Sequence, residues 1–183
     1  MTALLRFEQV TLRRGGRLLF EGLDLALAPG EALHVGGPNG TGKSSLIRLA
    51  AGLLHAERGR VWSERPALAD DALALDRELP LARALAFWGE PVEAAMDALG
   101  IAGLARVPVR LLSSGQAKRA TLARVAASGA PLWLLDEPLN ALDADGASRL
   151  AGLIDRHREG GGAVLCASHQ QLPGEWQTLE LRP

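Results

Sequence analysis

The chain of 183 residues contains no tyrosine, one cysteine and few aromatic residues, which make up 4% of it. The cysteine, Cys166, lies in the apolar run 163–167, so we expect a reduced thiol that packs in a core. Basic residues are not in excess, since the net charge is −1. This balance argues against nucleic acid as a partner, because binding to a phosphate backbone requires a basic surface.

Long apolar segments are also absent from the sequence. No run approaches the roughly 18 residues of a membrane-spanning helix. The N-terminus lacks the basic region followed by an apolar run that is typical of a signal peptide. We therefore expect one soluble, cytoplasmic domain, long enough to form a core and free to dock on a membrane protein.

Glycine, in contrast, is concentrated before a lysine, and lysine itself is rare. The chain has two lysines, and one of them, Lys43, lies in the segment Gly-Pro-Asn-Gly-Thr-Gly-Lys-Ser at residues 37–44. This segment matches the phosphate-loop pattern G-x-x-x-x-G-K-[ST]. Glycines allow successive N–H groups to face a triphosphate, Lys43 can reach its β- and γ-phosphates, and the Ser44 hydroxyl can ligate Mg²⁺. The expected ATP-binding residues are Gly37, Pro38, Asn39, Gly40, Thr41, Gly42, Lys43, Ser44 and Ser45.

The first part of the chain has the pattern of β structure. Apolar and charged residues alternate over residues 5–8, and Gly15-Gly16 is a turn signal. Because these segments are close in the chain, we expect local antiparallel pairing. The phosphate loop follows a short apolar run, and helical spacing after it predicts a helix to about Leu54. Residues 59–62 have the pattern of a short returning strand.

Residues 76–127 have the character of a helical region. Apolar residues recur at helical spacing from Leu81 to Trp88 and again after Pro91. We expect the large side chains Phe87, Trp88 and Met96 to pack in a core rather than to bind a cofactor.

Two further apolar runs, residues 131–135 and 163–167, have the length of buried strands and alternate with helical patterns. They predict an α/β fold whose parallel sheet binds ligands at the carboxyl ends of its strands. Asp136 and Glu137 follow the first run directly. Asp136 could hold Mg²⁺, directly or through water, and Glu137 could polarise a water molecule as general base. Taken alone, this pair could equally be an ordinary acidic strand-to-loop turn.

Three more motifs accompany this pair, and together they carry a resemblance to a known family. Residues 112–116 read Leu-Ser-Ser-Gly-Gln, residues 140–143 read Asn-Ala-Leu-Asp, and His169 follows the last apolar run. With the phosphate loop and residues 134–138, they resemble the ATP-binding cassette (ABC) ATPases over nearly the whole chain. The resemblance implies one P-loop NTPase domain of the ABC type over residues 1–183. It would have an N-terminal antiparallel β subdomain at about 1–30, an inserted α-helical subdomain at about 76–127, and a P-loop core in the remainder.

The resemblance also implies a mechanism. Two copies of the chain would pair head to tail and hydrolyse ATP to ADP and phosphate with Mg²⁺. Each ATP would lie between the phosphate loop of one copy and the family's signature motif, residues 112–116, of the other copy. Asp143 would communicate across the dimer, and His169 would hold the γ-phosphate and Glu137. Ser113 and Gly115 would contact the γ-phosphate from a helix N-terminus. The signature residues are Leu112, Ser113, Ser114, Gly115 and Gln116.

Within the family, the chain resembles the heme exporter ATP-binding subunits of bacterial cytochrome c maturation. Residues 30–33, 42–49, 112–119 and 128–138 carry this resemblance. It implies an integral membrane permease as partner and a peripheral position on the cytoplasmic face of the inner membrane, with no direct contact to heme. Two alternatives stay open: an ABC transporter ATPase for another cargo, and an ATP-gated dimerising module with weak hydrolysis.

The sequence departs from the family pattern at three places. Most members stack adenine on an aromatic residue, where this chain has Arg14. A guanidinium plane can stack on a base, so Arg14 is a hypothesis for the adenine contact, with a solvated hairpin charge as the alternative. Members of the family carry a glutamine between the phosphate loop and the signature, and this glutamine is not evident here. Asp70 or Asp71 could take its place and face a Mg²⁺-bound water. Alternatively, the two residues lie in a solvated loop. Ser114 stands where many members have glycine, and we expect binding to survive this change.

Overall fold

The computed structural model describes residues 3–182, whose strands and helices form successive layers. In chain order they are β1 (Leu5–Arg14), β2 (Arg17–Leu27), β3 (Ala32–Gly36), α1 (Lys43–Ala50), β4 (Arg58–Ser63), β5 (Pro66–Ala69), α2 (Leu81–Ala86), α3 (Val92–Ala98), the 3₁₀ turns η1 (Ala102–Leu104) and η2 (Val109–Leu111), α4 (Ser114–Ala127), β6 (Leu132–Asp136), α5 (Ala144–Glu159), β7 (Ala163–Ala167) and β8 (Gln177–Glu180).

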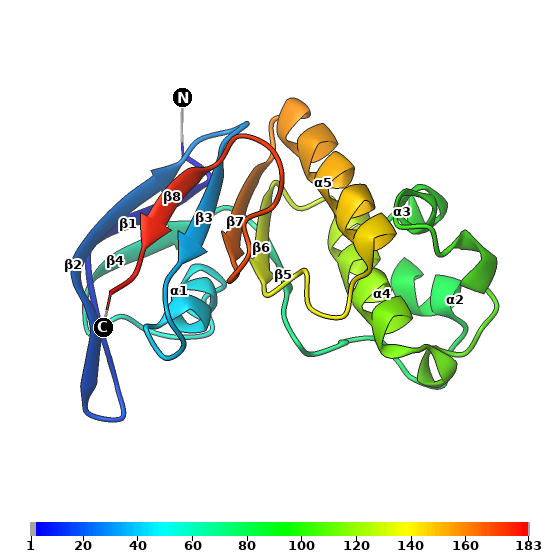
Figure 1. The fold of residues 1–183 in the computed structure, drawn as a ribbon, viewed down its shortest axis with the longest axis horizontal. Helices are drawn as coiled ribbons and strands as arrows, with labels where there is room; N and C mark the ends of the chain where they lie inside the picture. The colour runs from blue at the N-terminus through cyan, green and yellow to red at the C-terminus, as the bar shows by residue number, and fades with distance from the viewer. Residues whose placement is uncertain (1–2, 183) are drawn as a thin grey trace.

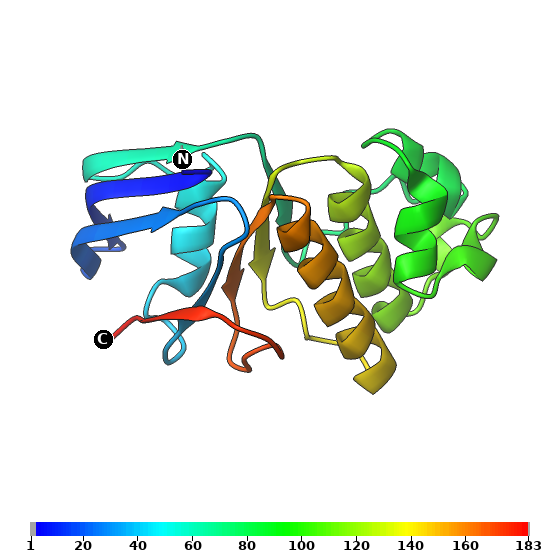
Figure 2. The ribbon, with the colours of Figure 1, turned by 90° about the horizontal axis from the view of Figure 1, so that it is seen from above.

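An antiparallel sheet lies at one end of the molecule, and a parallel sheet lies near its middle (Figure 1). Seen from above, α1 packs between the two sheets, while α4 and α5 cover the other face of the parallel sheet (Figure 2). Helices α2 and α3 lie beyond α4, at the far end. These layers confirm the predicted α/β fold, with its antiparallel sheet and its helical region.

The antiparallel sheet has the strand order β2-β1-β4. Strands β1 and β2 form the predicted hairpin around Gly15-Gly16, and β4 is the predicted returning strand. Leu5 and Phe7 are buried, whereas Arg6 and Glu8 are exposed, so the alternation in the sequence corresponds to one buried face.

The parallel sheet has the strand order β5-β6-β7-β3-β8, and its three middle strands are buried along their whole length. In β6, Leu132 and Leu134 pack on the side of α1, whereas Trp133 and Leu135 pack on the side of α4 and α5. Each such leucine contributes about 1.5–3 kcal/mol by burial. A strand covered on both faces needs apolar residues at every position, which explains the continuous runs in the sequence.

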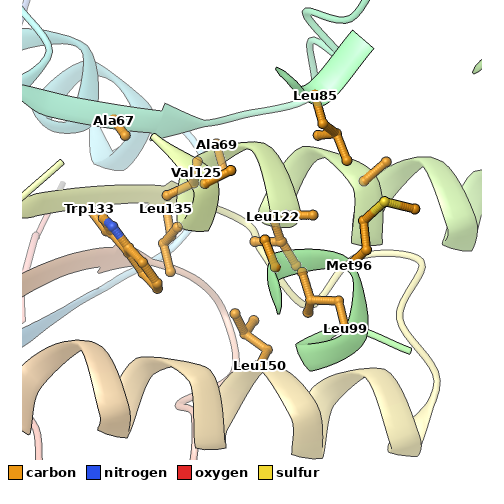
Figure 3. Close-up of a cluster of buried hydrophobic side chains, with 14 of the residues drawn as sticks. Ala67, Ala69, Leu85, Met96, Leu99, Leu122, Val125, Trp133, Leu135 and Leu150 are labelled. Atoms are coloured by element: carbon orange, nitrogen blue, oxygen red, sulfur yellow. The ribbon is translucent and has the colours of Figure 1, made fainter. Parts of the chain in front are cut away.

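The helical region shares a buried core with one face of the parallel sheet, and α4 lies at its centre. Leu85 of α2, Met96 of α3, Leu122 of α4 and Leu150 of α5 belong to one buried cluster (Figure 3). The expectation for Met96 is therefore confirmed, since only 2% of its surface is exposed.

The expectation that Phe87 and Trp88 pack in the core is wrong. Their surfaces are 84% and 38% exposed, respectively. Trp88 continues the spacing of Leu81 and Leu85, but helix α2 ends at Ala86, before it. Phe87 keeps a helical backbone but does not share the spacing of the buried residues, so its side chain is exposed. The indole of Trp88 instead lies under the guanidinium of Arg124, with 4.6 Å between the Cζ atom and the ring centroid.

Helix α1 is shorter than predicted. It ends at Ala50 rather than near Leu54, and Leu53 is 61% exposed. Gly52 has a φ of +71°, a left-handed conformation that glycine adopts without strain and that terminates helices. The Leu53 N–H donates a hydrogen bond to the Arg48 carbonyl at 2.9 Å, as is typical of a helix that ends at a left-handed glycine.

Cys166 lies in β7 with 0% of its surface exposed, which confirms its packing role. Burial raises the pKa of its thiol far above the ordinary value.

Among residues 3–182, no helix has both the length and the apolar character to cross a membrane.

Candidate nucleotide-binding site

The phosphate loop joins the end of β3 to the start of α1, as the sequence predicts. Gly42 caps α1 with a φ of +108°, and neither a side-chain cap nor an acidic residue occupies the first turn. The first N–H groups of α1 are therefore available to an anion, which the helix dipole also favours. A Cβ atom on Gly37 would lie 2.4 Å from the Leu181 carbonyl oxygen, so this first position requires glycine.

Lys43 folds back over the loop. Its Nζ atom donates to the carbonyl oxygens of Gly37 at 2.7 Å and Pro38 at 3.2 Å, and the residue is only 7% exposed. The Thr41 hydroxyl also donates to the Pro38 carbonyl, at 2.9 Å. The ammonium group is thus held within the loop, where phosphate oxygens would be stronger acceptors than these carbonyls.

Ser44 and Asp136 meet although they are far apart in the sequence. The Ser44 hydroxyl donates to Asp136 Oδ1 at 3.1 Å. Asp136 is 9% exposed; burial raises the pKa of its carboxyl, and the Ser44 hydrogen bond opposes this rise. Among residues 3–182 no basic side chain forms an ion pair with Asp136. A buried carboxylate that belongs to no such ion pair, beside a hydroxyl, is an oxygen donor set that fits Mg²⁺.

Glu137 and His169 lie together at the same edge of the sheet. His169 Nε2 is 2.8 Å from Asn39 Oδ1 and 3.6 Å from Glu137 Oε1, so His169 lies between the phosphate loop and the acidic residue. The Glu137 backbone has a φ of +46°, which is strained for a residue other than glycine. Its N–H donates to the Ala167 carbonyl at 2.8 Å, which joins the ends of β6 and β7.

Most of these groups line one cavity of about 550 Å³; Asp136, the hydrogen-bond partner of Ser44, is not among the lining residues. The loop, Ser44, Glu137 and His169 line it, and so does the exposed Arg14 at the end of β1. Leu19 and Asn140 line it as well, although the sequence reasoning missed both. Asn140 belongs to a motif already singled out, whereas nothing in the strand pattern around Leu19 indicates a contact with the loop.

Three of the signature residues, Ser113, Gly115 and Gln116, line a different cavity, of about 560 Å³. Ser113 caps α4 in a reciprocal arrangement: its hydroxyl accepts the Gln116 N–H at 3.3 Å, and Gln116 Oε1 accepts the Ser113 N–H at 2.9 Å. Ser114 is exposed, and Leu112 is half-buried. Within one chain, the signature is therefore not brought together with the phosphate loop.

Asp143 lies beside the signature and begins α5. Its Oδ1 atom accepts the Gly146 N–H at 2.9 Å, which makes it the helix cap. Arg119, which the sequence reasoning did not single out, donates to Asp143 at 2.5 Å, to Asp145 at 2.9 Å and to the Leu99 carbonyl at 2.9 Å. This network joins α4 to α5 and to the end of α3.

Asp70 and Asp71 directly follow β5, a strand that the sequence analysis did not predict. Strand β5 is parallel to β6, with Ala69 opposite Leu135. The two acidic residues therefore lie at the same edge of the sheet as Asp136 and Glu137.

Comparison with known proteins identifies the class of protein. The family model described as ABC transporter matches residues 20–140. A solved ATP-binding subunit of an ABC transporter superposes with a TM-score of 0.82 at 19% identity, covering 91% of this chain and 79% of that one. A Pyrococcus furiosus ABC transporter ATP-binding protein superposes with a TM-score of 0.84 at 18% identity, covering 97% and 96%. The fold is therefore that of an ABC-type ATPase.

More similar relatives define the subgroup. The cytochrome c biogenesis ATP-binding export protein CcmA of Sphingopyxis alaskensis is 56% identical, with 94% of this chain and 93% of that protein covered. The CcmA protein of Novosphingobium aromaticivorans is 52% identical, with 94% of this chain and 93% of that protein covered. The CcmA protein of Zymomonas mobilis is 47% identical, with 98% of this chain and 85% of that protein covered. The chain belongs to the CcmA family of ABC ATPases.

Proposed function

We propose that the chain is the ATP-hydrolysing subunit of a membrane export complex that delivers heme in cytochrome c biogenesis. The observation that carries the ATPase role is the meeting of the phosphate loop, Glu137 and His169 around one cavity. The names of the relatives supply the process, since each is an ATP-binding export protein of cytochrome c biogenesis. Heme itself need not touch this chain.

Each residue of the cavity has a role that its contacts support. Lys43 and the first N–H groups of α1 bind the phosphates. Ser44 and Asp136 would hold Mg²⁺, which supplies positive charge to the phosphate oxygens during hydrolysis. Glu137 orients the attacking water and accepts its proton, and His169, 3.6 Å away, holds Glu137 toward the γ-phosphate.

A second copy of the chain would complete the site. The signature and the phosphate loop line separate cavities, so one chain contacts only one side of a bound ATP. In a head-to-tail pair, Ser113 and Gly115 of one copy would face the γ-phosphate held by the other. Asp143 lies beside the signature, where it could report the state of one site to the other.

An exposed apolar surface supports a membrane permease as the other partner. Leu53, Phe87 and Trp88 are among the exposed large hydrophobic side chains, and Leu53 and Trp88 line a cavity of about 650 Å³. Exposed apolar surface of this kind is typical of protein–protein contacts. Docking there would place the chain on the cytoplasmic face of the inner membrane.

The test is complementation. The gene for this chain should restore cytochrome c formation in a Sphingopyxis alaskensis strain that lacks its own CcmA, as measured by heme staining of the c-type cytochromes. A Glu137→Gln variant should not restore it. If the chain accumulates and hydrolyses ATP but leaves the cytochromes without heme, the cargo is a different one.

A second variant separates docking from catalysis. Replacing Phe87 and Trp88 with serine removes exposed apolar surface outside the cavity that holds Glu137. This double variant should keep the ATPase activity of the purified chain and fail to complement. Full complementation would rule out this surface as the permease contact.

Arg14 is proposed as the adenine contact because it lines the cavity while its neighbour Arg13 pairs with Glu57 at 3.4 Å. Arg14→Ala should lower the affinity for ATP about threefold to tenfold, the range expected for stacking on a guanidinium. Calorimetric titration measures this, with Arg13→Ala as the matched control. Affinity for inorganic triphosphate should fall less; an equal fall would mean that Arg14 acts only through its charge.

A further inference from the structure

A buried histidine, His34, lies in β3 and has no part in the roles proposed so far. Only 6% of its surface is exposed, and it is the one polar side chain of the strand. Leu33 and Val35, its neighbours, pack on the side of α1, so the imidazole points to the opposite side of the sheet. There it lies opposite Cys166 of β7, which also points away from α1.

The imidazole forms a hydrogen bond with the backbone just beyond the end of β7. His34 Nε2 donates to the Ser168 carbonyl oxygen at 2.9 Å, and because a carbonyl only accepts, the proton lies on Nε2. Nδ1 is then without a proton, and it is buried without a hydrogen-bond partner among residues 3–182. The imidazole thus carries a desolvation cost that an apolar side chain would avoid, which indicates that its one hydrogen bond matters.

Strand β3 holds both backbone polar groups of Ser168. The Ser168 N–H donates to the Val35 carbonyl at 3.3 Å, and the Ser168 carbonyl accepts from His34. Ser168 is 1% exposed, and its Oγ atom accepts the N–H of Gln170 at 3.2 Å. His169 therefore lies between a residue anchored on β3 and a residue tethered to that anchor.

This anchoring matters for His169 because packing does little to hold it, since half of its side-chain surface is exposed. Its ring lies 2.8 Å from Asn39 Oδ1 and 3.6 Å from Glu137 Oε1. Both distances depend on where the preceding backbone places His169. Strand β3 leads directly into the phosphate loop, so one strand places both Asn39 and the backbone before His169 (Figure 1).

We propose that His34 is a positioning residue for ATP hydrolysis, which fixes the backbone immediately before His169 and so holds the His169 ring between the phosphate loop and Glu137. The inference rests on the ATPase role proposed above. His34 acts through His169 rather than on the nucleotide, since it is not among the residues that line the nucleotide cavity. A small displacement of a catalytic group can lower a rate by as much as about 10²-fold, so one hydrogen bond behind the site is enough to matter.

A double-mutant cycle tests this role by steady-state and single-turnover kinetics of the parent chain, His34→Leu, His169→Ala and the two combined. His34→Leu removes the donor and should lower kcat about tenfold, while KM for Mg·ATP changes less than about threefold, because the phosphate contacts stay in place. In the His169→Ala background the same change should cost less than about twofold, since the residue through which His34 acts is gone. An equal loss in both backgrounds, or no loss in the parent background, would overturn the proposal.

The conservative variant and histidine NMR add readouts that a merely structural role would not move. His34→Gln should keep most of the activity, because a glutamine amide donates from about the place of Nε2. The chain has four histidines, so the ring signals of isotope-labelled protein are assigned by substitution. The nitrogen shifts of His34 should place its proton on Nε2. His34→Leu should shift the His169 signals, and His34→Gln should leave them near their parent positions; unchanged His169 signals in His34→Leu would contradict the proposal.

His157→Leu is the matched control for the loss of a histidine from the core. His157 lies in α5, its ring stacks on Trp133 with 3.8 Å between the centroids, and it does not line the nucleotide cavity. This variant should lower Tm, change kcat less than about twofold and leave the His169 signals in place. If His34→Leu does not fold, His34→Asn enters the same cycle, because the shorter amide does not extend to the position of Nε2.

The outcomes also distinguish the two levels of the proposal. A parent chain that binds ATP but does not hydrolyse it would contradict the ATPase role itself, and the NMR comparison would then decide on His34. Hydrolysis by the parent chain together with an additive cycle would contradict only the role of His34.

Discussion

Replacing Glu137 with glutamine is expected to lower kcat for ATP hydrolysis by about 10²- to 10⁴-fold, the usual contribution of a positioned general base. The amide keeps the shape of the side chain and loses the ability to accept the proton of the attacking water. ATP binding should persist, because the proposed phosphate contacts are made by the loop and the start of α1 rather than by Glu137. Phosphate release measures the first effect, and calorimetric titration measures the second.

The same variant should form a stable dimer in Mg·ATP, which light scattering detects as a doubling of mass. The dimer should disappear when Lys43 is also replaced, because that substitution removes ATP binding. A monomer at saturating ATP would mean that the isolated chain cannot close without its membrane partner. Unchanged hydrolysis would mean that another group activates the water.

Replacing Lys43 with alanine is expected to lower ATP affinity by at least about 30-fold. The ammonium group is held inside the loop by the Gly37 and Pro38 carbonyls, so it is already positioned for the phosphates. Hydrogen bonds from a charged donor to phosphate are worth about 1.5–3 kcal/mol, and a long-range Coulomb term adds to them. Calorimetric titration with ATP measures the loss.

Arg48→Gln is the matched control for Lys43. Arg48 lies in the last turn of the same helix, is exposed, and is not among the residues that line the cavity. Its removal takes away one positive charge and should change ATP affinity less than about threefold. Tm should change little in either variant. Comparable losses for both would indicate a general charge effect rather than a specific phosphate contact.

Local patterns predict much of this molecule. The hairpin around Gly15-Gly16 follows from a turn signal between alternating strands, and the buried strands follow from apolar runs of strand length. The phosphate loop, with Lys43 at its end, follows from spacing alone, because its chemistry needs consecutive residues. These features depend on neighbours in the chain, so a single sequence is enough to recognise them.

Other features escape local patterns because they arise from contacts between distant segments. Strand β5, with four residues, is too short for a pattern and exists because β6 pairs with it. Trp88 fits the helical spacing of Leu81 and Leu85, but α2 ends before it, and the packing of the whole region decides where a short helix ends. The Arg119 network likewise depends on α3, α4 and α5 meeting.

The nucleotide site divides in the same way. Residue types and spacing were sufficient to name the loop in the sequence, whereas the roles of the acidic pair after β6, the signature and His169 were expected from the resemblance to the ABC ATPases. Tertiary structure alone decided their relations, among them the contact of Ser44 with Asp136 and the separation of the signature from the loop. The reason is physical: a covalent pattern specifies groups close together in the chain, whereas the distances between groups on different strands and helices are set by how the core packs.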